Sequence, residues 1–126
     1  MKGFLIVALG AAAGGAMRHG VNLAAARLLG VAFPWGTLLV NLLGCLAMGL
    51  LAGWFAFRGE ATQSWNLLLT TGVLGGFTTF SAFSLDVALL WERGAVGETL
   101  AYAGVSVAGS VAALFAGLAL MRLVTA

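Results

Sequence analysis

The groups best suited to chemistry in this sequence are neutral hydrogen-bonding side chains set inside long apolar runs. Thr37 and Asn41 are four residues apart in one run. The same spacing repeats in another run at Tyr102, Ser106 and Ser110, and side chains four apart share one helix face. Such donors can replace part of the hydration shell of a small anion and still release it. Each also has a structural explanation: serines can bond to their own helix carbonyls, and Asn41 can bond to a neighbouring helix.

A second group of polar residues lies in the segment 72–84, which reads GVLGGFTTFSAFS. Paired glycines and paired threonines are poor helix formers, so we predict that a helix breaks here. A break at membrane depth persists only where protein or a cavity satisfies the freed backbone groups. Freed carbonyls favour a cation, and freed N–H groups favour an anion. The hydroxyls of Thr79 and Ser81 join the candidate pathway; a packing kink without any ligand is the alternative.

Phe80 and Phe83 are three residues apart and therefore share one helical face. The edge of a phenyl ring is weakly positive, so ring edges in a narrow path support an anion without trapping it as a full charge would. Packing in the core or against lipid is the alternative for both rings.

Arg18 and Asp86 are charged side chains that lie within apolar segments. Arg18 is set well inside the first segment and has three possible roles: to snorkel to the surface, to cap carbonyls at the break, or to lend positive potential to a vestibule or interface. Asp86 lies about a turn and a half from the end of its segment, so it can reach the surface.

Several other kinds of chemistry are excluded. One His, one Cys and four acidic residues that do not cluster leave no nucleophile–base pair and no ligand set for a catalytic metal, so we expect no enzyme activity. The basic residues are scattered singly, which excludes a nucleic-acid partner. A proton-coupled transporter needs a carboxylate in the middle of a span, and no segment holds one there.

Composition places these groups in a membrane. Hydrophobic residues make up 62% of the 126 positions and charged residues 8%, against about 25% charged residues in soluble domains. A bilayer core about 30 Å thick needs roughly 20 apolar residues in a helix. Four stretches qualify, at about 3–29, 36–57, 65–91 and 99–121. We predict an all-α membrane protein, a single domain over residues 1–126. The beginning of the chain imitates a secretory signal, but its apolar sequence continues to Leu29, which favours a span.

The arrangement of charges bears on assembly. Loops are expected around Pro34, from Arg58 to Glu60, and from Glu92 to Gly94. The basic residues then divide almost evenly between the two sides. One side carries Lys2, Arg58 and Arg122, and the other carries Arg27 and Arg93, plus Arg18 if its side chain reaches that surface. Because Lys/Arg asymmetry sets orientation, this balance allows insertion in both directions. Glycine pairs four apart, such as Gly10 and Gly14, let helices approach closely, and four short spans enclose little interior, so an oligomer is expected.

The motifs resemble the CrcB/Fluc family of fluoride channels over essentially the whole chain. They are GGAMR at 14–18, WGT at 35–37 followed by Asn41 and Gly44, and GGFTTFSAFS at 75–84. The resemblance implies an antiparallel, dual-topology homodimer in the plasma membrane (the bacterial inner membrane). It further implies two pores that export fluoride passively and relieve fluoride toxicity.

The resemblance also implies roles for single residues. Phe80 and Phe83 match the pore-lining phenyl residues, and Asn41 matches a pore-side donor. The carbonyls of Gly75 and Thr78 match the ligands of a structural Na⁺ at the dimer centre. The polar track of the last helix and the arginine of the first span are matched by Tyr102, Ser106, Ser110 and Arg18.

Two other functions remain open. A small dual-topology multidrug transporter of the four-helix type shares the size and charge balance, but it needs a titratable carboxylate within a span. A non-conducting assembly subunit explains the glycines but not the polar stripes.

Overall fold

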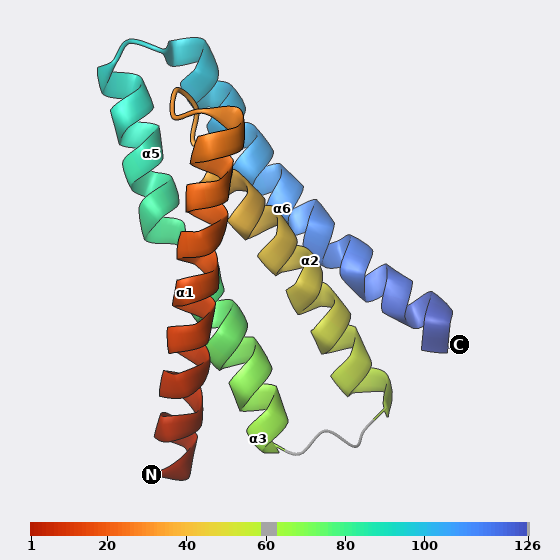
Figure 1. The fold of residues 1–126 in the computed structure, drawn as a ribbon. Helices are drawn as coiled ribbons and strands as arrows, with labels where there is room; N and C mark the ends of the chain where they lie inside the picture. Colours follow the sequence, from red (N-terminus) through yellow and green to blue (C-terminus); the bar gives the residue numbers. More distant parts are fainter. Residues whose placement is uncertain (59–62, 126) are drawn as a thin grey trace.

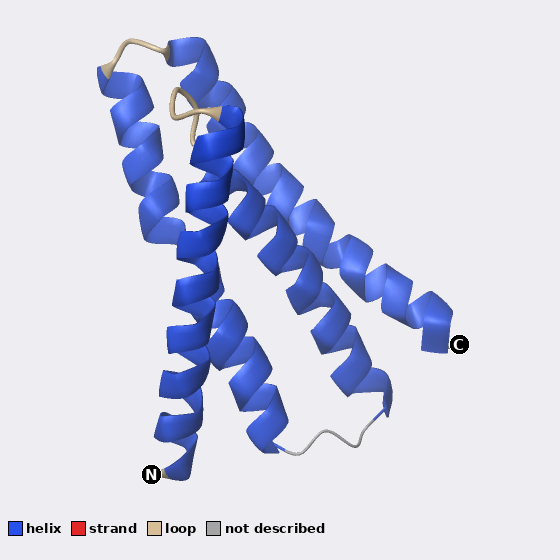
Figure 2. Cartoon of the chain, in the orientation of Figure 1, coloured by secondary structure: helices blue, strands red, loops and turns tan. Residues whose placement is uncertain are grey.

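A computed structural model describes residues 1–58 and 63–125, with the side chains of residues 57 and 58 left aside. The predicted loop from Arg58 to Glu60 lies mostly outside these residues. Nearly all of the described chain is helical (Figure 2). Four helical stretches are long and apolar enough to cross a membrane, which confirms the all-α prediction with four long apolar helices. Three of them are α1 (Lys2–Leu29), α2 (Trp35–Arg58) and α6 (Val96–Thr125).

The third stretch is not one regular helix. It consists of α3 (Gln63–Asn66), the π-helical η1 (Leu67–Leu74), α4 (Gly75–Phe77) and α5 (Phe80–Glu92). Between α4 and α5 the backbone is extended, with φ −75° and ψ 157° at Thr78 and φ −155° and ψ 120° at Thr79. The two halves are visibly offset from one another (Figure 1). The predicted break after the paired glycines is therefore present.

The wide π-helical turns of η1 were not predicted. Thr70 Oγ1 donates a hydrogen bond to the Asn66 carbonyl at 2.6 Å. A threonine hydroxyl that bonds to the carbonyl four residues earlier competes with the backbone N–H and loosens a helix. This contact lies where the α-helical pattern changes to the π-helical one.

Glycines bring the helices into close contact in two places. An added Cβ at Gly10 of α1 would lie 2.8 Å from the Cα of Gly72 in η1. An added Cβ at Gly117 of α6 would lie 2.5 Å from the carbonyl oxygen of Leu46 in α2. Both distances are too short for a side chain, so the glycines permit backbone-to-backbone packing. Helix α1 therefore packs on the first half of the third span, and α2 packs along α6.

The remaining half, α5, is held at the opposite end of the bundle from the N-terminus (Figure 1). There a small core of Leu38, Phe83, Leu90 and Tyr102 joins α2, α5 and α6. The turn between α1 and α2 closes over the same end (Figure 1). The break in the third span thus lies between two separately packed halves of the molecule.

Candidate functional site

Asn41 holds the extended break in place. Its Nδ2 donates to the carbonyl of Thr79 at 3.0 Å, and its Oδ1 accepts from the Thr79 N–H at 2.8 Å. The helix-to-helix bond that the sequence left open as an alternative is therefore made, between α2 and the break. The amide nitrogen carries a second N–H, and Asn41 also lines the groove described below.

The break is completed by a cap on α5. Thr79 Oγ1 accepts from the N–H of Ala82 at 3.2 Å and lies 3.2 Å from Ser81 Oγ. In a continuous helix, the N–H groups of Thr79 and Ala82 would bond to the carbonyls of Gly75 and Thr78. Both N–H groups bond to side chains instead, so these two carbonyls are released from the regular helical pattern.

Arg18 reaches the break from α1. Its Nη1 donates to the Thr78 carbonyl at 3.4 Å, and the side chain is half-buried. Of the three roles that the sequence allowed, capping a carbonyl at the break is the one seen in the structure. At 3.4 Å this contact is long for a hydrogen bond, so the cap on the Thr78 carbonyl is a weak one.

An open groove of about 480 Å³ runs beside the break. Its walls come from α2, α4, α5 and α6, and include most of the candidate residues. The lining residues are Asn41, Cys45, Gly75, Thr78, Thr79, Phe80, Phe83, Ser106, Val107, Ser110 and Val111. The fold thus brings together polar residues that are up to 69 positions apart in the chain, as from Asn41 to Ser110.

The serines of this groove are the unusual members. The Oγ atoms of Ser106 and Ser110 are buried and have no hydrogen-bond partner among the described residues. Tyr102 lies close to Ser106; its hydroxyl donates to Asp86, and although its oxygen can also accept, no hydrogen bond joins it to Ser106 Oγ in the described structure. By contrast, Thr99 Oγ1 in the same helix donates to the Ala95 carbonyl at 2.8 Å. The bonding of serine to its own helix, which explains many membrane serines, is therefore not made by Ser106 or Ser110.

Aromatic rings form the opposite wall. Phe80 and Phe83 lie with their ring centroids 5.3 Å apart and their planes tilted by 49°. Phe80 is 74% exposed, whereas Phe83 is buried against Tyr102. The two rings therefore differ in environment: Phe83 is fixed in the core, and Phe80 stands at the open side of the groove.

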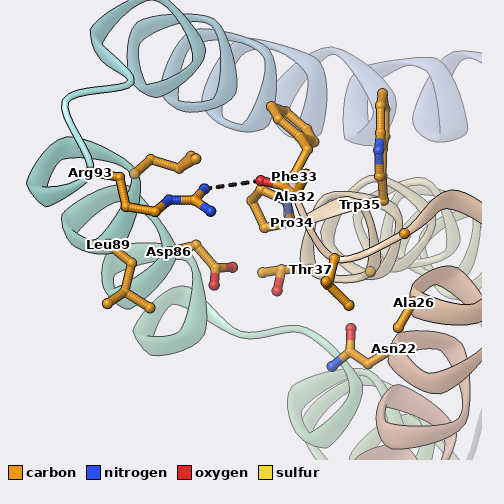
Figure 3. Close-up of a pocket in the computed structure, with 14 residues that line it drawn as sticks. Asn22, Ala26, Ala32, Phe33, Pro34, Trp35, Thr37, Asp86, Leu89 and Arg93 are labelled. Carbon is orange, nitrogen blue, oxygen red and sulfur yellow. Dashed lines mark hydrogen bonds between the residues drawn. The ribbon is translucent and has the colours of Figure 1, made fainter.

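Three of the predicted pathway residues lie outside this groove. Thr37 is buried and lines a second cavity, of about 380 Å³, together with Asn22, Asp86 and Arg93 (Figure 3). We call this cavity the vestibule. Ser81 is exposed and reaches the site only through Thr79. Tyr102 is fully buried, so it is part of the core rather than an open wall.

Sequence reasoning missed the vestibule. Asp86, which lies near enough to the end of its span to reach the surface, is partly buried and accepts a hydrogen bond from the Tyr102 hydroxyl at 3.0 Å. Arg93 donates through Nη2 to the Ala32 carbonyl at 2.9 Å and ties the turn between α1 and α2 to the end of α5 (Figure 3). These pairs are 16 and 61 positions apart, and no local spacing indicates them.

Known proteins resemble this chain over almost its whole length. A family model described as "CrcB-like protein, Camphor Resistance (CrcB)" matches residues 5–118. The fluoride-specific ion channel FluC of Methylobacterium nodulans is 58% identical over 97% of this chain and 98% of its own. The FluC 2 protein of Nitrobacter hamburgensis is 55% identical over the same shares. The FluC protein of Phenylobacterium zucineum is 54% identical over 100% of both chains. With four membrane-spanning helices and these relatives, the chain belongs to the CrcB/FluC family of multi-pass membrane proteins.

Proposed function

We propose that this chain is a fluoride-selective channel that exports fluoride passively across the plasma membrane and so relieves fluoride toxicity. The observation that carries the proposal is the pair of buried serine hydroxyls, Ser106 and Ser110, that lack partners in a groove with Asn41 and Phe80. A buried hydroxyl without a partner costs about 1–3 kcal/mol. A passing anion that accepts both hydroxyl protons removes that cost. The names of the relatives, fluoride-specific ion channels, identify the anion.

The lining explains a preference for a small halide. Hydroxyl and amide donors carry no net charge, so they substitute for hydration water without holding the ion permanently. The weakly positive edge of Phe80 adds to this attraction. Fluoride accepts hydrogen bonds strongly and is small enough to approach several donors at once, whereas a larger halide meets them poorly.

The working unit in this proposal is an antiparallel homodimer. In a single subunit the groove is open on one side, and Phe80 beside it is 74% exposed. A second copy would close the groove and cover the ring. The near-even division of basic residues between the two sides supports insertion in both directions, and an antiparallel pair then carries two equivalent pores. The whole chain, residues 1–126, acts as one membrane domain.

A structural Na⁺ at the dimer centre is part of the same proposal. The carbonyls of Gly75 and Thr78 fit this role, because the N–H groups of Thr79 and Ala82 bond elsewhere. Carbonyls at a broken helix suit a cation. A carbonyl oxygen has two lone pairs, so the contact from Arg18 leaves Thr78 able to bind the ion. Such a cation would offset the cost of bringing fluoride into a low-dielectric site.

Reconstitution tests the function directly. Purified protein in liposomes loaded with fluoride should release fluoride rapidly and chloride hardly at all, as followed with ion-selective electrodes. Proton-dependent uptake of a cationic dye would instead indicate a multidrug transporter. If neither process occurs, the chain is a non-conducting assembly subunit.

A further inference from the structure

An unbroken series of aromatic contacts runs from the turn between α1 and α2 to the groove. Phe33 lies 5.5 Å from Tyr102, ring centroid to ring centroid, with the planes at 87°. Tyr102 lies 5.4 Å from Phe83, and Phe83 lies 5.3 Å from Phe80. At the outer end, Phe33 lies 4.6 Å from Trp35. All these separations fall in the range where aromatic pairs attract one another.

The turn that carries Phe33, residues 30–34, is held at several points. It begins at Gly30, whose φ of 84° favours glycine. The N–H of Trp35 donates to the Phe33 carbonyl at 2.8 Å. Arg93 donates to the neighbouring Ala32 carbonyl at 2.9 Å (Figure 3). The Phe33 ring is therefore presented to Tyr102 by a turn with a defined shape.

Tyr102 is the member of this series that lies between the vestibule and the groove. Phe33 lines the vestibule, and Phe83 lines the groove. Tyr102 contacts both rings and is fully buried, so it stands between the two spaces. Its hydroxyl is held by Asp86, which also lines the vestibule. The ring of Tyr102 therefore lies beside the direct line from the vestibule to the groove.

We propose that Phe33 is a positioning residue for permeation: its ring, held by the turn that Arg93 fastens, keeps Tyr102 and through it Phe83 in the orientation that leaves the groove passable. The proposal rests on the channel function proposed above. Without the ring at residue 33, Tyr102 can lean toward the vestibule, and Phe83 loses the neighbour that fixes its edge.

The experiment measures fluoride and chloride efflux from liposomes for Phe33→Leu, Phe33→Tyr and the matched control Phe4→Leu. Phe4 is 83% exposed on α1, so its replacement tests the loss of a phenyl ring as such. Phe33→Leu should lower the fluoride flux by about two- to ten-fold, from the strength of one aromatic contact, and lower the fluoride-to-chloride ratio. Phe33→Tyr keeps the ring and should restore both values. Phe4→Leu should match the wild type.

The outcomes separate the inference from the channel function. If the wild-type protein releases no fluoride, the channel function is refuted. If the wild type is active and Phe33→Leu is equally active and selective, only the positioning role is refuted. A loss of flux with an unchanged ratio, not restored by Phe33→Tyr, would also refute it, because general destabilisation then suffices. If Phe33→Leu fails to assemble, Arg93→Met tests the same proposal, because it releases the turn at Ala32 and keeps the rings of Phe33, Tyr102 and Phe83. It should lower flux and ratio more than Arg27→Met, which removes a charge near the same end, and equal effects would overturn the proposal.

Discussion

Replacement of Ser106 by alanine should stabilise the protein and slow fluoride at the same time. The Ser106 side chain is 4% exposed, and its hydroxyl has no partner among the described residues. Alanine removes this unsatisfied group and with it a cost of about 1–3 kcal/mol. The lost hydroxyl would have donated to fluoride, and a hydrogen bond to a charged group is worth about 1.5–3 kcal/mol. If the barrier rises by that amount, the flux falls by roughly ten- to 150-fold.

Thr99 provides a matched control in the same helix. It is also 4% exposed, but its hydroxyl donates to the Ala95 carbonyl at 2.8 Å. Thr99→Val keeps the shape and loses a satisfied bond, so stability should fall by about 0.5–1.5 kcal/mol while the flux stays at the wild-type value. Tryptophan fluorescence during thermal unfolding in detergent gives the sign of each change in stability, and fluoride efflux from liposomes gives the flux.

The opposite signs make the test decisive. A Ser106→Ala protein that is less stable than the wild type and conducts normally would show that the hydroxyl has a structural role. The pathway would then have to be sought away from this face of α6.

Four further predictions follow from the same geometry. Phe80→Ile should reduce fluoride efflux and leave the fold of the subunit intact, because the ring is 74% exposed in one subunit; undiminished efflux would remove the phenyl-edge argument. Asn41→Leu should destabilise the protein by about 2–6 kcal/mol, since two Thr79 backbone groups lose their partner. A smaller loss of stability in thermal unfolding would count against the role of Asn41 in holding the break. Several lysines added after Ala126 should bias insertion and lower the yield of active dimer in membranes; equal yield counts against dual topology. Exchange of Na⁺ for a large organic cation should lower the unfolding temperature, and an unchanged temperature contradicts a structural ion.

The parts of the fold that sequence predicted are those that depend on local composition. The four helices follow from the length of the apolar runs, because a bilayer demands about 20 such residues in sequence. The break follows from Gly75, Gly76, Thr78 and Thr79, four weak helix formers within five positions. The shared face of Ser106 and Ser110 follows from helical periodicity. Each of these features is decided within one or two turns of chain.

The parts that sequence did not predict depend on partners far away in the chain. The sequence showed only that Asp86 can reach the surface, whereas the fold adds a hydrogen bond from Tyr102 of α6. Arg93 was assigned only to a loop, whereas its guanidinium fastens the turn at Ala32. Thr37 and Asn41 share a helical face, yet they line different spaces. Tertiary packing decides all three.

The contrast between Asn41 and the serines shows how the two kinds of information combine. In the sequence, Asn41 is the more conspicuous donor, since an amide in mid-span is rarer than a serine. In the fold, both ends of its amide serve the backbone of Thr79, so its first role is to build the break, and only its second N–H remains for the groove. Ser106 and Ser110 are left with buried hydroxyls that the described residues do not satisfy. Because such groups are costly, they persist where something outside the chain pairs with them, and a passing anion meets that requirement.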